Sequence, residues 1–134
     1  MKKNGFTLIE LLVVLVILSI ISTFAYSSYQ NVIIKIRRFD AQTELTKVQM
    51  LQSSYHIIHP SYISDIELIH FPIENDFYSF SLVSASTHRY LIKAVAKTNN
   101  TQNNDENLCK TLFIDQDNIK TSDGYTDNAS CWDH

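Results

Sequence analysis

One acidic side chain, Glu10, lies within the most apolar part of the sequence. The run from Phe6 to Tyr26 contains no other charged residue. Placing an ionised carboxylate inside a membrane-spanning helix costs on the order of 2.5–3.5 kcal/mol, even on a lenient insertion scale. A simple anchor would not need this group, whereas a carboxylate that meets a cation can be buried. Glu10 therefore predicts an ionic pair with a positive group that another molecule supplies.

A second set of residues that could bind a ligand is basic. Arg89, Lys93 and Lys97 recur at every fourth position in a segment that alternates like a β-strand. Alternate residues of a strand face the same side, so these side chains are predicted to share one face, with Lys110 and Lys120 close to it. Such a strip could contact DNA phosphates. The alternative is a solvated strand face, which is the commoner origin of this pattern.

The net charge limits how nucleic acid could be bound. The sequence has a formal charge of −3, from 11 basic and 14 acidic residues. Without Lys2 and Lys3, which precede the apolar run, nine basic residues stand against fourteen acidic ones, which gives −5. This balance excludes a globally basic nucleic-acid-binding protein.

No arrangement typical of an enzyme is visible. The sequence has no nucleophile–base constellation and no glycine-rich phosphate-binding loop. His56 and His59 could share a helical face and hold a metal, but scattered surface histidines are the simpler interpretation. Residues 115–118, with Asp123, could bind calcium, but they lack the glycine spacing of an EF-hand and resemble ordinary polar turns. We predict a non-enzymatic chain without a cofactor or a metal.

Cys109 and Cys131 are the only cysteines, and both lie in the last quarter of the chain. In an oxidising compartment an isolated pair is predicted to form a disulfide. Closing that loop would be worth roughly 3 kcal/mol in the chain-entropy model. The contribution would matter, because residues 121–130 have little apolar content. A free or metal-bound pair is the alternative.

One long helix and a small sheet are predicted to position these groups. Helix-forming residues continue from about Phe6 to Ile58, and Pro60 supplies the stop. At 1.5 Å per residue this helix would be roughly 80 Å long, which is abnormal for a globular domain.

After the helix the pattern changes to a period of two, as in strands. Residues 78–83 and 89–97 are predicted to form an antiparallel hairpin, 111–114 a third strand and 118–121 a short fourth. The polar residues 99–107 are predicted to be a loop. The fold class is therefore α+β, with a long N-terminal helix packed on an antiparallel sheet of three or four strands.

Two apolar stripes are predicted on the second half of the helix, at 100° per residue. The stripe that faces the chain's own sheet contains Leu45, Val48, Leu51 and Tyr55. The stripe that faces neighbouring helices of a larger assembly contains Val32, Ile36 and Phe39. The alternative is the drift of one wide apolar face.

The N-terminal residues resemble the signal of type IV prepilins. That motif is a short basic leader, a Gly before the cleavage site, a Phe after it and a Glu four residues further on, and it is matched by Lys2, Lys3, Gly5, Phe6 and Glu10. The resemblance implies that a prepilin peptidase cuts between Gly5 and Phe6 and that Phe6 is N-methylated. It also implies that Glu10 pairs with the N-terminal amine of a neighbouring subunit. An ordinary single-span anchor would leave Glu10 unexplained, and a secretory signal peptide would need a small-residue cleavage site, which residues 22–26 match poorly.

The chain is similar to the PilE-type minor pilins of the type IV pilin family over residues 25–31 and 37–42. The resemblance implies a leader at 1–5, a hydrophobic helix at 6–31 for the membrane and the filament core, and a head domain at 32–134. It implies a type IV pilin fold with a disulfide-closed C-terminal region. The implied partners are major and minor pilin subunits, the prepilin peptidase and an inner-membrane assembly platform.

Charge and family together predict location and role. Lys2 and Lys3 are expected to stay in the cytoplasm, which places the head in the periplasm and later on the extracellular pilus. The basic residues 35–38 argue mildly for the opposite orientation. We predict a minor pilin that acts in pilus assembly. The alternatives are a DNA-binding pilus subunit for natural transformation, through Arg89, Lys93 and Lys97, and a type II secretion pseudopilin, which the cysteine pair disfavours.

Overall fold

The computed structural model describes residues 5–65, 68, 71, 73–123 and 130–132. The predicted leader lysines, Lys2 and Lys3, lie outside the described residues. The chain divides into two compact units, Met1–Ile33 and Ile34–His134.

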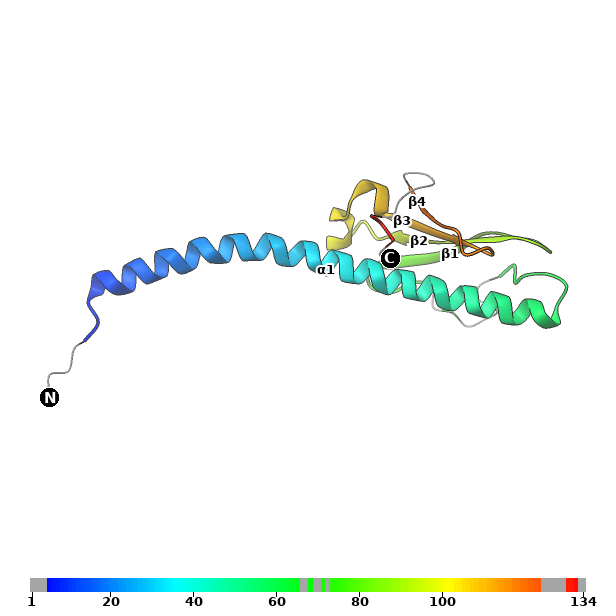
Figure 1. The fold of residues 1–134 in the computed structure, drawn as a ribbon, viewed down its shortest axis with the longest axis horizontal. Coiled ribbons are helices and arrows are strands. Elements are labelled where there is room, and N and C mark those ends of the chain that lie inside the picture. The colour runs from blue at the N-terminus through cyan, green and yellow to red at the C-terminus, as the bar shows by residue number, and fades with distance from the viewer. Residues whose placement is uncertain (1–4, 66–67, 69–70, 72, 124–129, 133–134) are drawn as a thin grey trace. The chain divides into compact units, whose positions relative to one another are not determined.

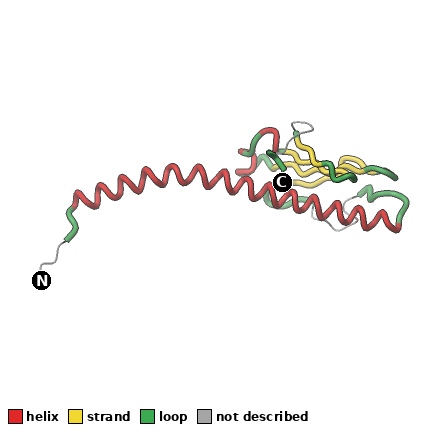
Figure 2. Tube along the Cα trace, viewed as in Figure 1, coloured by secondary structure: helices red, strands yellow, loops and turns green. Residues whose placement is uncertain are grey.

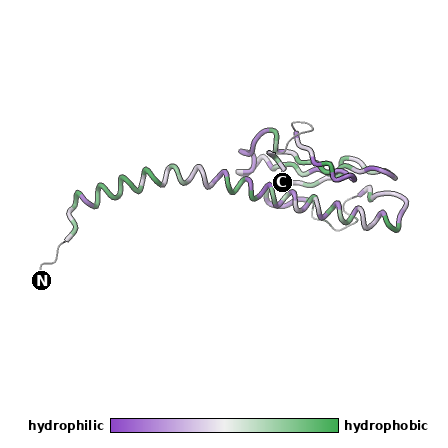
Figure 3. Tube along the Cα trace, viewed as in Figure 1, coloured by the Kyte–Doolittle hydropathy of each residue, from purple (hydrophilic) through white to green (hydrophobic). Residues whose placement is uncertain are grey.

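The helix α1 extends from Leu8 to Ile58, a span of 51 residues. Pro60 follows two residues after its end, which agrees with the predicted stop. Of the described residues, only α1 contains a stretch long and apolar enough to cross a membrane, and no side chain of that stretch is buried within the chain. Figure 3 shows the high hydropathy of its N-terminal part. The long helix predicted from the sequence is therefore confirmed.

Within the described residues, four strands form one antiparallel sheet in the order β1-β2-β3-β4 (Figure 1). The strands are β1 (Tyr78–Ala85), β2 (Tyr90–Ala96), β3 (Thr111–Asp115) and β4 (Lys120–Ser122). Neighbours in the sheet are also neighbours in sequence, so the sheet is a simple meander (Figure 2). The predicted hairpin and the two further strands are confirmed, with shifts at their ends.

The core lies between the sheet and the second half of α1. The strand β2 alternates strictly, and its buried residues are Tyr90, Ile92, Ala94 and Ala96. On α1, the residues that pack into the same cluster are Ala41, Leu45 and Val48, each at most 1% exposed. The buried face of β2, which repeats every two residues, and the face of α1 that carries residues 41, 45 and 48 therefore pack together in one apolar layer.

The helix face turned to the sheet differs from the predicted stripe in one turn. Leu45 and Val48 are buried as predicted, but Leu51 is 41% exposed, so its assignment to the sheet was wrong. Gln52 is buried in that turn, because the position four residues after Val48 continues the inward face. Its side chain exchanges two hydrogen bonds with the backbone of Ile63, at 2.9 and 3.0 Å. These bonds satisfy the buried side-chain amide of Gln52, which takes the inward place that the prediction gave to Leu51.

The second apolar stripe stays outside the core of the chain. Val32, Ile36 and Phe39 are each more than half exposed. Tyr55, expected to face the sheet, is only half-buried and stacks on His59 with ring centroids 3.8 Å apart. The contact of the outer stripe with neighbouring helices stays a prediction.

The segment between β2 and β3 is more regular than a plain polar loop. It contains two short 3-10 helices, η2 (Thr101–Asn104) and η3 (Asn107–Cys109). Gln102 and Asp105 are buried within it, so the prediction of a simple loop over 99–107 was wrong. The physical reason is that these polar side chains find buried partners on other elements. Cys109 is bonded to Cys131, which confirms the predicted disulfide.

Candidate functional site

Glu10 and Thr7 form a capping box at the start of α1. The backbone nitrogen and the hydroxyl of Thr7 each donate to Oε2 of Glu10 at 2.8 Å, and the amide of Glu10 donates to Oγ1 of Thr7 at 3.3 Å. Each side chain satisfies an N–H group that the helix leaves free. Glu10 therefore has a local hydrogen-bonding role in helix capping that the sequence interpretation did not include, beside the predicted ionic pair. Its other oxygen, Oε1, accepts no hydrogen bond from the described residues, so the ionic pair with another molecule stays a prediction.

The predicted basic strip lies along β2. Lys93 is inside the strand, and Arg89 and Lys97 lie just beyond its two ends. The even-numbered residues of β2 are buried, so Lys93 projects from the opposite, outer face. It is paired in register with Ser81 on β1 and with Phe113 on β3. Lys93 forms no ion pair with any described residue, which leaves its ammonium free for a ligand.

The two ends of the strip have acidic neighbours that the sequence did not predict. Nζ of Lys97 lies 3.0 Å from Oε2 of Glu74. Arg89 lines an open hollow together with Asp115 and Asp117. The structure therefore keeps the spacing of the strip but neutralises part of its charge.

Of the two lysines expected close to the strip, only one lies at its edge. The ammonium of Lys120 lies 5.5 Å from the ring centroid of Trp132, on the helix side of the sheet. Lys110 is at the end of β2, where its carbonyl oxygen accepts the amide of Ala96 at 2.8 Å. Its Nζ donates to Oδ1 of Asn103 at 3.5 Å, toward the η2 segment.

A further cation, Arg37 on α1, lies at this same end of the sheet. Its guanidinium carbon is 3.8 Å from the ring centroid of Phe77, and Nη1 donates to Oγ1 of Thr101. The carbonyl of Phe77 accepts the amide of Lys97 at 2.8 Å. Phe77 therefore contacts both cations: its ring makes a cation–π contact with Arg37, and its carbonyl binds the amide of Lys97. Arg37 belongs to the basic residues 35–38, and no local pattern in the sequence indicates its contact with Phe77.

Arg38, the next residue of α1, ties the helix to two distant segments. It is buried and forms a bidentate ion pair with Asp105, with Nε 3.0 Å from Oδ2. Its Nη1 donates to the carbonyl of Ser130 at 3.0 Å. One turn further on, Gln42 donates to the carbonyl of Cys131 at 2.7 Å. The helix therefore holds both the β2–β3 segment and the C-terminal segment.

Gln102 extends this buried polar network. Its Nε2 lies 2.9 Å from the Tyr78 hydroxyl and 3.2 Å from both Oδ2 of Asp105 and the carbonyl of Ile34. Burial, followed by the Asp105 charge, raises the pKa of Tyr78 well above its ordinary value. Burial lowers the pKa of Arg38, but hydrogen bonding and attraction to Asp105 outweigh burial and raise it overall. Arg38 therefore stays charged at any physiological pH.

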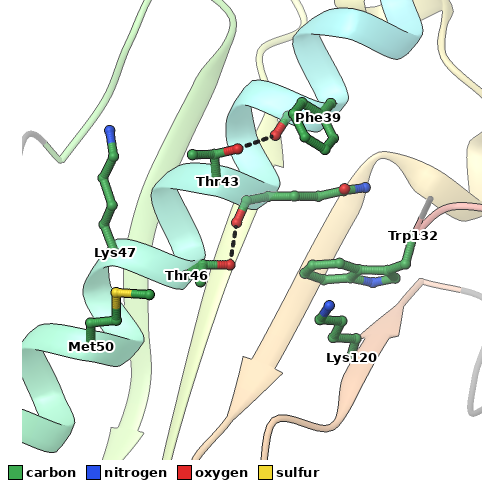
Figure 4. Close-up of a pocket in the computed structure, with 8 residues that line it drawn as sticks. Phe39, Thr43, Thr46, Lys47, Met50, Lys120 and Trp132 are labelled. Atoms are coloured by element: carbon green, nitrogen blue, oxygen red, sulfur yellow. Dashed lines mark hydrogen bonds between the residues drawn. The ribbon is translucent and has the colours of Figure 1, made fainter. Parts of the chain in front are cut away.

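An open hollow lies between α1 and the C-terminal segment (Figure 4). The residues that line it are Phe39, Gln42, Thr43, Thr46, Lys47, Met50, Lys120 and Trp132. Phe39 and Met50 are 56% and 66% exposed, whereas Trp132 is buried and donates Nε1–H to the carbonyl of Thr121 at 2.9 Å. The hollow adjoins the outer apolar stripe of the helix.

The acidic side chains considered for calcium have local roles. Oδ1 of Asp115 accepts the amides of Asp117 and Ile119, each at 2.9 Å. Oδ2 of Asp123 accepts the amide of Thr111 at 2.8 Å. These carboxylates hold the β3–β4 turn and the start of β3. Over the described ranges, no group of three His, Cys, Asp or Glu side chains is placed to hold a metal ion.

Two protein-family models match the sequence over adjacent ranges. Residues 27–113 match the family described as type IV minor pilin ComP, DNA uptake sequence receptor. Residues 1–26 match the prokaryotic N-terminal methylation motif. The first match includes β1, β2, the η2 segment and the strip, and it ends before Lys120 and Cys131. The family's description names a DNA receptor, which is one of the functions left open by the sequence, and names neither an assembly subunit nor a pseudopilin.

Two solved structures have a similar fold. A type IV pilin from Shewanella oneidensis gives a TM-score of 0.58 at 22% identity and covers 75% of this chain and 99% of that chain. The non-core minor pilin PilV from Neisseria meningitidis gives 0.57 at 12% identity and covers 75% and 95%. At these identities the likeness shows the type IV pilin fold alone, as the sequence predicted. A comparison with curated proteins gave no match.

Proposed function

Because this chain belongs to the type IV minor pilin ComP family, we propose that it is a pilus subunit that binds double-stranded DNA outside the cell for uptake. The observation that carries the proposal is the family match over residues 27–113, whose description is that of a DNA uptake sequence receptor. Pilins of this family are not enzymes, and DNA capture requires only a binding surface.

The outer face of β2 and the end of the sheet beside η2 supply the cations for this surface. Lys93 projects from the centre of β2, and Lys97, Lys110 and Arg37 lie at the end that adjoins η2. Residues four apart on a strand are about 13 Å apart. This spacing is close to the width of the DNA major groove, about 12 Å. Lys93 and Lys97 could therefore contact phosphates on the two sides of one groove.

Acidic side chains beside the strip determine which of its cations can contribute to DNA binding. Glu74 has 62% of its side chain exposed, and an exposed ion pair of this kind is worth little, so Lys97 can exchange it for a phosphate. Arg89 shares its hollow with Asp115 and Asp117, which repel phosphate. We therefore assign the main contacts to Lys93 and Lys97, and the weakest to Arg89.

Assembly into a pilus brings the head to the cell surface. The methylation-motif match supports cleavage between Gly5 and Phe6, methylation of Phe6, and an anchor at residues 6–31 with the head at 32–134 in the periplasm. In the filament, Glu10 keeps its Thr7 cap and offers Oε1 to the N-terminal amine of a neighbouring subunit. The partners in this scheme are other pilin subunits, the prepilin peptidase and the inner-membrane platform.

The exposed stripe of α1 fits a contact with other subunits. Ile36 and Phe39 are more than half exposed, and Phe39 adjoins the hollow beside Trp132. Apolar side chains presented to water in this way are typical of surfaces that become covered on association. This stripe lies on the helix, whereas Lys93, a main proposed DNA contact, lies on the outer face of the sheet.

DNA binding by the mature chain in detergent micelles tests the proposal. Fluorescence anisotropy with short labelled duplexes should show an affinity that falls as salt rises from about 50 to about 200 mM, with a log–log slope of about −0.9 per phosphate neutralised. Lys93→Gln should weaken binding to all duplexes and reduce the slope by about 1. Lys47→Gln, which removes a lysine already paired with Glu44, is the matched control. Absence of binding at physiological ionic strength, or binding that does not weaken as salt rises, would overturn the proposal.

A further inference from the structure

The segment between β2 and β3 has an unusual density of side-chain amides. Residues 98–107 contain five asparagines and one glutamine. Asn100 caps η2, because Oδ1 accepts the amide of Gln102 at 2.9 Å, and Nδ2 donates to the carbonyl of Asp76 at 2.8 Å. Gln102 is buried in the polar network. These two amides therefore have structural roles that keep them away from a ligand.

The remaining amides of η2 face solvent. Asn103 and Asn104 are exposed, as is Asn99 just before the helix. Asn103 has one long contact, at 3.5 Å from Lys110. Asn99 and Asn104 form no side-chain hydrogen bond with any described residue. Their amide groups are thus free to donate and accept at the same time.

The scaffold beneath these amides is rigidly held. Asp105 is paired with Arg38, and Gln102 contacts Tyr78 and the backbone of Ile34. The disulfide of Cys109 fixes the end of the segment. A buried ion pair adds little net stability because both charges lose their hydration, but removing one partner leaves an uncompensated charge, so the pair keeps the segment joined to α1. The backbone that carries the exposed amides is therefore already ordered, so binding a ligand would cost only the freedom of the asparagine side chains themselves.

Cations border the same segment. Arg37 donates to Thr101 in the first turn of η2, and Lys110 donates to Asn103. Lys97 lies where β2 leads into the segment. Phosphates bound by these three side chains would bring the edge of a DNA groove to the exposed amides. Phosphate contacts set the position of a duplex, whereas contacts with base edges set the sequence.

We infer that the η2 segment reads DNA sequence, with the amides of Asn103 and Asn104 bound to the edges of adenine in the major groove. This inference rests on the proposed function, since it needs a duplex held by the neighbouring cations. Asparagine matches adenine because its oxygen accepts from N6–H and its nitrogen donates to N7. The ligand class is therefore duplex DNA with an A·T pair at a defined position.

Selection from a pool of duplexes with randomised centres tests the inference, using the mature chain in detergent. The wild-type chain should enrich a motif that contains A·T pairs. Affinity for the enriched duplex should then exceed that for a scrambled duplex, and Asn103→Ala or Asn104→Ala should reduce this ratio by about tenfold. Binding of the scrambled duplex should not change. Lys110→Gln should weaken binding of both duplexes equally, and Asn31→Ala, which removes an exposed amide elsewhere, should change neither.

The outcomes separate this inference from the proposed function. Salt-dependent binding without any sequence preference overturns the inference and leaves the proposed function intact. A preference that Asn103→Ala and Asn104→Ala retain also overturns the inference, as does an equal loss of affinity for both duplexes. Absence of all DNA binding overturns both. Circular dichroism of each variant should match the wild type, because neither side chain is buried.

Discussion

Arg38 and Asp105 are 67 positions apart in the sequence, yet their side chains form a bidentate ion pair that is only 2% and 1% exposed. Asp105 belongs to the segment that carries the exposed amides, and Arg38 also holds the carbonyl of Ser130. The pair and the bond to Ser130 therefore join the helix to the polar β2–β3 segment and to residues 130–132 near the C-terminus. Their main consequence is a single fixed arrangement of these parts.

Loss of Arg38 should be strongly destabilising. Arg38→Met leaves the Asp105 carboxylate buried without a cation, and we expect the free energy of unfolding to fall by about 3–5 kcal/mol. Urea unfolding followed by circular dichroism measures the change. Arg37→Met, which affects a partly exposed side chain, should cost much less. A double variant, Arg38→Met with Asp105→Asn, should lose less than the sum of the two single variants, and strict additivity would argue against the pair.

The sequence predicts the regular parts of this fold because their signals are local. Alternation in 90–96 identifies β2 and its buried residues, and Pro60 places the end of α1. The polar core is different. Gln102 and Asp105 lie in a polar stretch that looks like a surface turn. Nothing near them in the sequence indicates that Asp105 pairs with Arg38. Gln52 is hidden in the same way, because its partner, the backbone of Ile63, has no sequence signature.

The candidate DNA surface could be predicted in outline only. A spacing of four residues places Lys93 on the outer face of β2, as the register shows. The pairing of Lys97 with Glu74 and the approach of Arg37 to Phe77 depend on how separate elements pack. Periodicity fixes the face of a strand, but contacts between elements follow from the tertiary structure.

Reduction of the disulfide should release the C-terminal segment. Opening the Cys109–Cys131 bond is expected to lower the free energy of unfolding by about 3 kcal/mol, because the unfolded chain regains the freedom of the open loop. Trp132 is the single tryptophan and is buried beside Cys131, so its emission reports on this segment. We expect a lower urea midpoint and a red shift in reducing buffer. An unchanged midpoint would show that the bonds from Arg38 and Gln42 hold the segment without the disulfide.

Alkaline pH should destabilise the head through two buried tyrosines. Burial, followed by the charge of Asp105 for Tyr78 and by Tyr62 for Tyr90, raises both pKa values above the ordinary 10.0. The folded chain keeps these phenols neutral above pH 10, while the unfolded chain ionises them, so this stabilisation is complete below pH 10 and is lost as pH rises further. Each tyrosine should contribute a fall of about 1.4 kcal/mol per pH unit.

Tyrosinate absorbance recorded together with circular dichroism checks this alkaline transition. Ionisation of Tyr78 and Tyr90 should coincide with loss of secondary structure. Tyr78→Phe cannot ionise, so its stability should fall less steeply with pH. Equal slopes for the variant and the wild type would contradict the assignment to Tyr78.

Glu10→Gln separates the capping role of this residue from its charge. Glutamine preserves a capping box with Thr7, since either Glu or Gln serves at this position. If the charge pairs with the N-terminal amine of a neighbouring subunit, the variant should remain in the membrane fraction and be absent from sheared pili. Immunoblots of the two fractions measure this, with Leu11→Val as a matched control. Normal amounts of the Gln variant in pili would show that helix capping is the main role of Glu10.

The most direct test of DNA capture by this subunit is the transformation frequency of cells that carry Lys93→Gln and Lys97→Gln in the chromosomal copy. Pili should form in normal number and contain the variant subunit, because Lys93 lies on the sheet face opposite α1 and Lys97 lies just beyond the end of β2, both away from the exposed apolar stripe of the helix. Under these conditions we predict that transformation falls by about tenfold or more, through loss of two phosphate contacts. Wild-type transformation frequency with the variant subunit present in the pili would contradict the account.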